Sequence, residues 1–185
     1  MSWRQIAQKI KQSNYALKHK LWPGFKAPKF HYKQLAESET FAGMRILHAG
    51  GGRNKHNLFE GQQLWRLNVD LDRATLAQDA GANGRVLGDL ERLPVQENSI
   101  DLIVCEMVFE HVENPERITR ELFRCLKEGG KIIFITPNLL SYPFLISKLT
   151  PFWFHQLYGF LRARRDEDIF PTHYRLNTIA ALRRH

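Results

Sequence analysis

Three consecutive glycines at positions 50–52 are the residues of this 185-residue chain best suited to holding a ligand. They follow the apolar run Ile46–Ala49 and precede Arg53 and Asn54. Glycine has no Cβ, so it reaches positive φ easily and lets the backbone approach a bound molecule closely. At the carboxyl end of a parallel strand, where open α/β sheets bind ligands, such a turn offers backbone N–H groups to the ligand. A glycine-rich loop without a ligand is the alternative, and the residues downstream decide between the two.

Acidic residues follow the next two apolar runs. Asp70 and Asp72 come about twenty residues after the glycines, and Asp89 follows the third run. A carboxylate at the carboxyl end of a strand can accept two hydrogen bonds from a ribose diol. Aspartate is also favoured as a helix N-cap, so both functions fit, one for each residue of the pair Asp70 and Asp72.

The elements that must position these residues alternate between strand and helix. The sequence predicts five strands: Arg45–Ala49, Leu64–Val69, Arg85–Leu87, Ile100–Cys105 and Lys131–Ile135. Between them it predicts a short helix within Arg53–Glu60, a helix at Arg73–Ala80, and a helix that begins at Asn114 and Pro115 and ends at Gly129 and Gly130. Parallel strands need crossover connections, so the alternation predicts an α/β fold with a doubly wound, Rossmann-like, mostly parallel sheet and flanking helices.

Residues 1–40 form a basic N-terminal arm in front of the predicted core, residues 41–138. Eight lysines and arginines precede the first acid, Glu37. Apolar residues at helical spacing predict an amphipathic helix that ends before Pro23, followed by irregular chain up to the core. Residues 1–33 are expected either to form a solvated helix face or to contact an anionic membrane surface or nucleic acid.

Residues 139–185 form a third segment that is expected to cover the site. Leu139–Leu161 is dense in aromatic residues and carries one charge, Lys148. Large apolar surfaces rarely stay exposed, so this stretch is expected to be a lid over an apolar substrate, a membrane-surface helix or a homodimer contact. An amphipathic helix is predicted to begin at Thr178.

Composition places the chain in the cytoplasm, with peripheral membrane contact as an alternative. The length is that of one domain, and the net charge of +8 is concentrated in the arm. The two cysteines, Cys105 and Cys125, lack metal-ligand spacing, so reduced thiols and no metal site are predicted. No apolar run is long enough to span a membrane, and the N-terminus lacks the apolar core of a signal peptide.

The ordered set of motifs resembles the class I S-adenosylmethionine-dependent methyltransferases over about Arg45–Asn138. Residues 46–52 are similar to the first motif of that family, Asp70 to the second, and Gly88–Pro94 to the third. The similarity continues through Asn98–Val104, Phe109–Val112, Leu126–Lys131 and Thr136–Asn138.

The resemblance implies S-adenosyl-L-methionine as the cofactor. By position, it implies that the turn of Gly50, Gly51 and Gly52 approaches the methionine part and that Asp70 binds the ribose. It also implies that Leu71 lies against the adenine, while Asp89 and Leu90 hold it. Arg53 is our candidate cation for the methionine carboxylate, and Glu106 is expected to contact cofactor or substrate, or to accept backbone N–H bonds.

Two residues depart from the family pattern. His48 occupies the position of an acid that orients the bound cofactor, and Asn54 replaces a third glycine. On this basis we expect the exchange His48→Asp to tighten cofactor binding. A nicotinamide-dependent dehydrogenase is the rival, but Gly50, Gly52 and Lys55 do not form the triplet GxGxxG.

The implied activity is methyl transfer to a small or lipid-linked acceptor, on oxygen or carbon. The reaction needs an aligned nucleophile, and a base if the nucleophile carries a proton. His111 is the first candidate for this base, with packing at a helix start as its alternative role, and His155 and His173 are further candidates. The alternatives are a non-catalytic binding protein of the same fold and a nucleic-acid methyltransferase. The latter ranks lower because Thr136–Asn138 lacks the Asn-Pro-Pro-aromatic signature.

The family's sheet usually ends in an antiparallel strand pair after the fifth strand. This sequence provides no counterpart for that pair, so a truncated or short form of the fold is expected.

Overall fold

The computed structural model describes residues 26–138 and 173–183, together with selected positions up to Gly24. The chain divides into two compact units, one formed by Pro28–Pro137 with Thr172–His185, the other by Met1–Ala27 with Asn138–Pro171. All the predicted cofactor-binding residues lie in the first of these units, as does His111.

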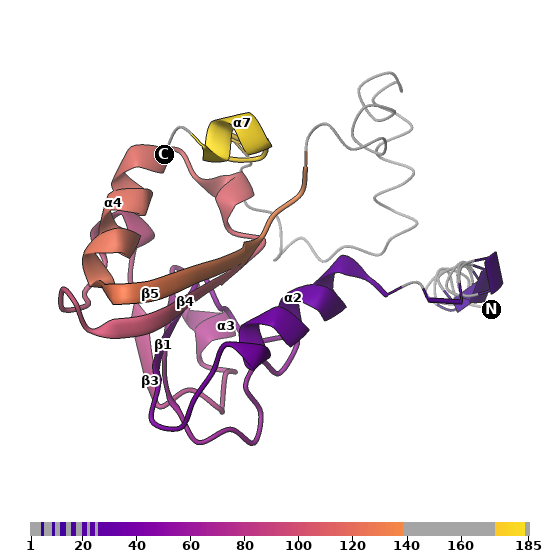
Figure 1. Ribbon diagram of the computed structural model, residues 1–185, viewed down its shortest axis with the longest axis horizontal. Helices are drawn as coiled ribbons and strands as arrows, with labels where there is room; N and C mark the ends of the chain where they lie inside the picture. The colour runs from indigo at the N-terminus through magenta and orange to yellow at the C-terminus, as the bar shows by residue number, and fades with distance from the viewer. Residues whose placement is uncertain are drawn as a thin grey trace. The chain divides into compact units, whose positions relative to one another are not determined.

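Five parallel strands form the centre of this unit (Figure 1). They are β1 (Arg45–Ala49), β2 (Trp65–Asp70), β3 (Gly84–Leu87), β4 (Ile100–Glu106) and β5 (Leu126–Ile135). Their order is β3-β2-β1-β4-β5, and all neighbours are parallel. The order reverses between β1 and β4, which is where doubly wound sheets leave a ligand crevice at their carboxyl edge. The predicted α/β fold with a parallel sheet is confirmed.

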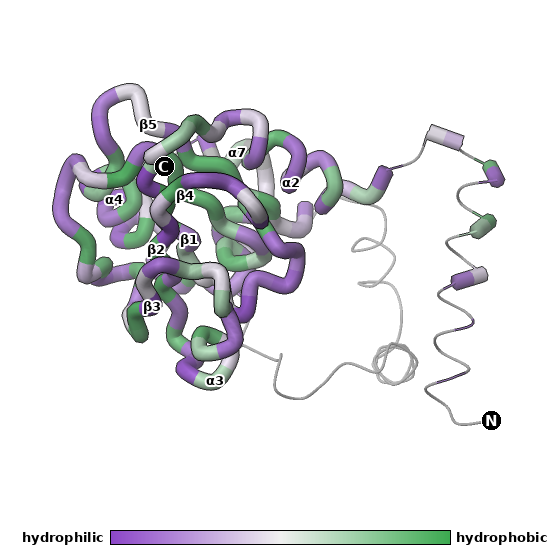
Figure 2. Tube along the Cα trace, turned by 90° about the horizontal axis from the view of Figure 1, so that it is seen from below, coloured by the Kyte–Doolittle hydropathy of each residue, from purple (hydrophilic) through white to green (hydrophobic). Residues whose placement is uncertain are grey.

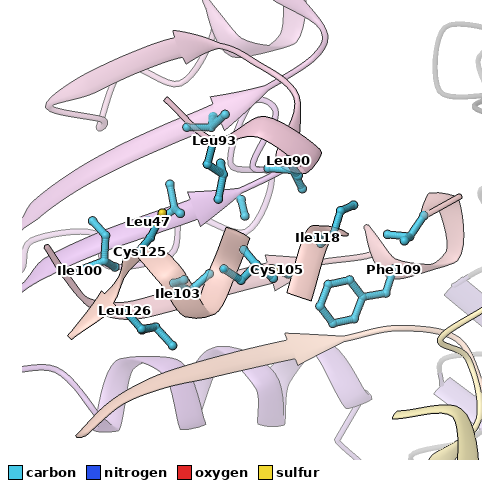
Figure 3. Close-up of a cluster of buried hydrophobic side chains, with 14 of the residues drawn as sticks. Leu47, Leu90, Leu93, Ile100, Ile103, Cys105, Phe109, Ile118, Cys125 and Leu126 are labelled. Atoms are coloured by element: carbon cyan, nitrogen blue, oxygen red, sulfur yellow. The ribbon is translucent and has the colours of Figure 1, made fainter. Parts of the chain in front are cut away.

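Helices cover both faces of the sheet, with α2 (Pro28–Ser38) and α4 (Pro115–Cys125) on opposite sides (Figure 1). The core beneath α4 contains Leu47, Ile103 and Cys105, which Figure 3 shows together with Leu90 of the 3₁₀ helix η1 (Leu90–Arg92). The core beneath α2 contains the alternate strand residues, among them Ile46, Leu102 and Val104. This division follows from the two-residue period of a strand. Figure 2 shows hydrophobic segments through the centre of this unit and mainly hydrophilic loops outside it.

The predicted helix caps divide the two aspartates as the sequence suggested. Asp72 is the N-cap of α3 (Arg73–Leu76), and its Oδ1 accepts the N–H of Ala74 at 2.9 Å. Asn114 caps α4 by accepting the N–H of Arg117 at 3.2 Å. Asp70 is therefore left at the edge of the sheet.

The short helix predicted within Arg53–Glu60 is wrong, because this segment makes a series of turns. Asn54, Asn57 and Phe59 have φ values of 51°, 48° and 65°, which a right-handed helix does not contain. The side-chain oxygen of Asn54 accepts the N–H of Leu58 at 3.0 Å. Such side-chain bonds to the backbone compete with helix formation.

The irregular chain predicted after Pro23 is also wrong, because α2 begins at Pro28. Proline is well tolerated in the first turn of a helix. Tyr32 and Ala36, one turn apart, are the buried residues of α2.

The helix α4 ends at Cys125, four residues before the glycines that were expected to end it. Gly129 and Gly130 lie inside β5, close to a shift in the register between β4 and β5. A Cβ on Gly130 would lie 2.8 Å from Cδ2 of Leu126 and 2.9 Å from the carbonyl oxygen of Lys127. Close packing within the strand therefore requires glycine at this position.

The described positions of the N-terminal arm up to Leu21 are helical, in agreement with the predicted helix there. The helix α7 (Ile179–Leu182) lies within the segment predicted to be helical from Thr178. Residues 139–161, expected to form the lid, and His155 lie outside the described residues. Within the described ranges, no helix is both long enough and apolar enough to cross a membrane.

Candidate functional site

The glycine turn, residues 50–52, leaves the carboxyl end of β1 in a conformation that requires glycine. Gly50 and Gly52 have left-handed φ values of 65° and 47°. Only glycine fits at position 51, because a Cβ there would lie 2.5 Å from Cγ of His48 and 2.6 Å from Oδ1 of Asn68. A Cβ on Gly50 would lie 2.5 Å from Cγ2 of Val108, which follows β4. The turn is therefore enclosed by side chains of the neighbouring strands and loops.

The peptide groups of Gly52 are held on both sides by residues of β2. The N–H of Gly52 donates to Oδ2 of Asp70 at 2.7 Å, and its carbonyl accepts from Nδ2 of Asn68 at 2.9 Å. Oδ1 of Asp70 accepts the N–H of Asp72 at 2.8 Å. Because a carboxylate has about four acceptor positions, Asp70 can anchor the turn and still accept from a ligand hydroxyl.

Arg66, Asn68 and Asp70 form a polar stripe along one face of β2. Arg66 is 2% exposed and Asn68 is fully buried. Both pair with the buried carboxylate of Asp79: Nη2 of Arg66 donates to Oδ1 at 2.9 Å, and Nδ2 of Asn68 to Oδ2 at 2.7 Å. Burial opposes ionisation of Asp79, but these hydrogen bonds outweigh it and hold the pKa of Asp79 below its usual range. The polar stripe thus links the glycine turn to the segment after α3.

His48 packs against the glycine turn and is only 1% exposed. Its register partner on β2 is Asn68. Burial, reinforced by the positive charge of Arg66, lowers the pKa of His48 to about 4, so the imidazole is neutral at pH 7. A carboxylate at this position would be buried near that of Asp79. The structure therefore argues against the expected gain in affinity from His48→Asp.

The residues expected around the ribose and the adenine follow the ends of β2 and β3. These strands are neighbours, and Asp70 of β2 pairs in register with Leu87 of β3. Leu71 is 66% exposed directly after Asp70. Asp89 is also exposed, and its Oδ1 accepts the N–H of Glu91 at 2.9 Å. The side chain of Leu90 lies in the core beneath α4 (Figure 3), so it is not available to a ligand.

Arg53 lies half-buried immediately after the turn. It forms no ion pair with any residue in the described ranges. Its guanidinium is the cation nearest in sequence to the three glycines, and guanidinium groups bind carboxylates in a bidentate manner.

Glu106, the last residue of β4, belongs to a three-way cluster with Lys29 and His56. Oε1 of Glu106 lies 2.7 Å from Nζ of Lys29 and 3.0 Å from Nε2 of His56. The two nitrogens lie 3.2 Å apart. Sequence analysis did not identify Lys29 or His56 as site residues. The only signal was the spacing of Lys29 and Lys33, which share a face if the segment is helical.

His111 lies in the short 3₁₀ helix η2 (Phe109–His111) that follows β4, and it is half-buried. The adjacent Glu110 is 4% exposed, and burial raises the pKa of its carboxyl group. Oε2 of Glu110 accepts from the hydroxyl of Thr136, at the end of β5, at 3.1 Å. The structure thus brings His111 to the same edge of the sheet as Glu106, through the loop after β4.

Residues 173–177 return to this edge of the sheet. The N–H of His173 donates to the carbonyl of Glu110 at 2.8 Å, while the histidine itself is exposed. Nδ2 of Asn177 donates to Oγ1 of Thr136 at 2.6 Å and to the carbonyl of Pro137 at 2.8 Å.

An open hollow of about 570 Å³ lies at the start of α4 rather than at the glycine turn. It is lined by Glu91, Glu113, Asn114, Pro115, Glu116 and Arg175. Among the described residues, no group of three or more histidine, cysteine or acidic side chains is arranged to hold a metal ion.

The order of the strands, the glycine turn after β1 and the aspartates after β2 and β3 define a doubly wound α/β domain of the kind that binds nucleotide-like ligands. Comparison with known proteins is more specific. A family model described as a methyltransferase domain matches residues 47–134. Residues 47–134 therefore form a methyltransferase domain similar to those of the class I S-adenosylmethionine-dependent methyltransferases, whose cofactor is S-adenosyl-L-methionine.

Several curated relatives support this family. A probable S-adenosylmethionine-dependent methyltransferase of Mycolicibacterium smegmatis is 31% identical over 131 residues, which cover 68% of this chain and 50% of the relative. A malonyl-[acyl-carrier protein] O-methyltransferase of Methylococcus capsulatus is 40% identical over 57 residues, covering 31% and 21%. A ubiquinone/menaquinone biosynthesis C-methyltransferase of Vibrio cholerae is 28% identical over 130 residues, covering 63% and 47%. The matches span half of each relative's length or less.

The solved structures show the same fold. The crystal structure of the YcgJ protein of Bacillus subtilis superposes with a TM-score of 0.55 at 22% identity, covering 65% of this chain and 56% of that one.

Proposed function

We propose that this chain binds S-adenosyl-L-methionine at the carboxyl edge of β1, β2 and β4 and transfers its methyl group to a small or lipid-linked acceptor. The observation that carries the proposal is the double anchoring of Gly52 by Asp70 and Asn68. It fixes the glycine turn beside an acidic residue that retains acceptor capacity, which is what a ribose diol requires.

The residues at this edge fit the chemistry of the cofactor. Asp70 would accept from the ribose hydroxyls, and Asp89 from the adenine amine. Leu71 offers an exposed apolar surface to the base. Arg53 would pair with the methionine carboxylate. When bound, the cofactor supplies an electrophilic methyl group, and the protein's task is to hold an acceptor in line with it.

The names of the relatives support a small or carrier-linked acceptor without deciding the atom that is methylated. One is named for O-methylation of malonyl-[acyl-carrier protein] and another for a C-methylation in ubiquinone/menaquinone biosynthesis. The basic residues 1–33 and the aromatic residues 139–161 support an amphiphilic acceptor and contact with a membrane surface or a second copy of the chain. In this proposal, residues 1–40 are an arm, 41–138 the cofactor-binding core and 139–185 the substrate segment of a cytoplasmic enzyme.

A non-catalytic binding protein is the second candidate, and His48 favours it. A buried neutral imidazole stands where the family carries an acid, so this turn lacks the negative charge that orients the bound cofactor. Formation of any methylated product would exclude this candidate.

Calorimetric titration with S-adenosyl-L-homocysteine, the demethylated cofactor, tests the proposal. We expect Asp70→Asn to raise the Kd at least tenfold, because hydrogen bonds to a charged group contribute about 1.5–3 kcal/mol. Asp72→Asn is the matched control: it removes the same charge two residues away, and asparagine is as good an N-cap as aspartate. We expect the control to stay within twofold of the wild-type Kd. Absence of binding at millimolar ligand would refute the proposal, and equal effects of the two variants would refute the role of Asp70.

A further inference from the structure

We propose that His56 is the general base for an acceptor whose nucleophilic atom carries a proton, and that Glu106 and Lys29 are its positioning residues. This inference rests on the proposed methyl transfer. It specifies the methyl acceptor as a hydroxyl group or an acidic carbon. It also assigns the general base to His56 in place of His111.

The cluster lies where the fold places ligands. Glu106 is the carboxyl-terminal residue of β4, and β4 pairs with β1 at the point where the strand order reverses. His56 comes from the turns that follow the glycine turn, and Lys29 from the first turn of α2. Three segments far apart in the sequence therefore bring one acidic and two basic side chains together at the carboxyl end of β4.

We assign the Nε2-protonated tautomer to His56. Nε2 lies 3.0 Å from Oε1 of Glu106, to which it can donate, and 3.2 Å from Nζ of Lys29, which itself donates to the same carboxylate oxygen. The lone pair is then on Nδ1, the other ring nitrogen. The side chain of His56 is 37% exposed, which gives a ligand access to the ring. A carboxylate that fixes the tautomer of a histidine base is a general feature of nucleophile-activating sites.

The charges around His56 come from one carboxylate and one ammonium. The ammonium of Lys29 pairs with Glu106 at 2.7 Å and lies 3.2 Å from Nε2 of His56. Once the imidazole takes a proton, the carboxylate of Glu106 compensates its charge. Other charged groups also bear on the cluster. Lys33 donates to the carbonyl of His56 at 3.0 Å, and the charge of Lys29 acts on buried Glu110.

A buried hydroxyl is an independent sign of a ligand at this place. Tyr32 of α2 is 6% exposed, and its Oη has no hydrogen-bond partner among the described residues. Burial, together with the nearby Cys105 and Glu106, raises the pKa of Tyr32, so the hydroxyl keeps its proton and can donate. A buried hydroxyl normally has a hydrogen-bond partner, and an oxygen of the methyl acceptor bound at the cluster would provide one.

The proposed step balances within the site. The acceptor oxygen or carbon forms its bond to the methyl carbon, and the carbon–sulfur bond breaks with its electron pair going to sulfur. The proton of the acceptor passes to Nδ1 of His56 and is later released to water.

The test uses the full chain with S-adenosyl-L-methionine labelled in its methyl group and three probes. Catechol offers a hydroxyl, acetylacetone an acidic carbon, and succinate a carboxylate that carries no proton at pH 7. Variants His56→Gln, Glu106→Gln and His111→Gln are compared with the control His31→Gln, which changes an exposed histidine on α2. Binding of S-adenosyl-L-homocysteine is measured in parallel.

We expect methylation of catechol or acetylacetone, and a loss of kcat of about 100-fold or more in His56→Gln, the usual range for removal of a general base. In that variant the Kd for S-adenosyl-L-homocysteine should stay within twofold, and kcat should no longer rise with pH as the histidine deprotonates. Glu106→Gln should lower kcat and displace the pH profile, while His31→Gln should change neither and His111→Gln should keep the wild-type rise of kcat with pH. These readouts distinguish a base from a residue that only supports the loop.

Three results would overturn the inference while leaving cofactor binding intact: wild-type kcat and pH profile in His56→Gln, methylation of succinate but of neither other probe, or methylation of none. A failure to bind S-adenosyl-L-homocysteine would instead refute the proposed function, and this inference with it.

Discussion

Buried polar atoms without a hydrogen-bond partner lie at the candidate site. Within the described ranges they are Tyr32 Oη, His48 Nδ1, Asn68 Oδ1 and Asn177 Oδ1. Such an atom costs about 1–3 kcal/mol in the folded state, and a folded protein keeps few of them. Their positions around the glycine turn, the Glu106 cluster and the end of β5 support a function at this edge of the sheet.

His48 makes the stability of the fold depend on pH. The unfolded imidazole takes up a proton near its ordinary pKa of 6.5, whereas the folded one does so only near 4. As the pH falls from 7 to 5, protonation therefore favours the unfolded chain, and we expect this residue to remove about 2 kcal/mol of unfolding free energy. The measurement is urea unfolding at both pH values for wild type and His48→Asn.

The variant His31→Asn controls for the loss of an exposed histidine. It should keep the pH dependence of the wild type, whereas His48→Asn should lose about 2 kcal/mol of it. An unchanged pH dependence in His48→Asn would mean that the folded protein tolerates the charged imidazole.

At the scale of elements, side chains of α2 hold the turns that are found instead of the helix expected after β1. Nζ of Lys33 donates to the carbonyls of His56 and Asn57, both at 3.0 Å. Oε1 of Glu37 accepts the N–H of Phe59 at 3.1 Å. The turns after the glycine turn thus satisfy backbone groups through side chains of α2, which also fixes the position of His56.

Asn54 has a left-handed backbone conformation and a hydrogen-bonded side chain, and two substitutions can separate their contributions to stability. Its φ is 51°, and its side chain bonds to the backbone of Leu58 at two points. Asn54→Ala should lower the unfolding free energy by about 2–3 kcal/mol, because alanine is strained in the left-handed region and the side-chain bonds are lost. Asn54→Gly loses the bonds without the strain, so it should be more stable than the alanine variant by about 1 kcal/mol. Thermal or urea unfolding of both variants measures the difference, and equal stabilities would contradict the role of the backbone conformation.

The strands and their terminal residues could be predicted because each is marked by a pattern within a short stretch of sequence. An apolar run ends at a glycine or an acid in β1, β2 and β4, and parallel pairing then brings those ends to one edge. The helix α2 was missed because two buried residues in eleven make a weak pattern. Lys29 and His56 were missed because their partner Glu106 is distant in sequence, 77 positions from Lys29. The burial of Leu90 likewise depends on packing against α4, which no local pattern encodes.

At the scale of the molecule, residues 173–178 are part of the same compact unit as the sheet, although 34 residues outside the described ranges separate them from β5. Leu176 is 1% exposed in the core beneath α4, and Asn177 is 2% exposed. The segment that follows residues 139–172 therefore contributes to the stability of the cofactor-binding core.

Leu176→Ala tests this contribution. We expect a loss of about 2–5 kcal/mol of unfolding free energy, the usual result of truncating a fully buried leucine. Arg183→Ala, at an exposed position nearby in sequence, should change it by about 0.5 kcal/mol or less. Urea unfolding measures both. A loss below about 1 kcal/mol in Leu176→Ala would mean that the core retains its stability without this side chain.

The polar stripe of β2 has a consequence for how the chain finds its fold. Arg66 and Asn68 lie opposite Ile46 and His48 of β1. A slip of one residue in this pairing would turn the stripe to the other face, where it would enter the apolar core beneath α4. That arrangement would bury a cation away from Asp79, at a cost of several kcal/mol. The buried charges thus make misregistered sheets less stable than the native one, in addition to holding the turn at which the cofactor is proposed to bind.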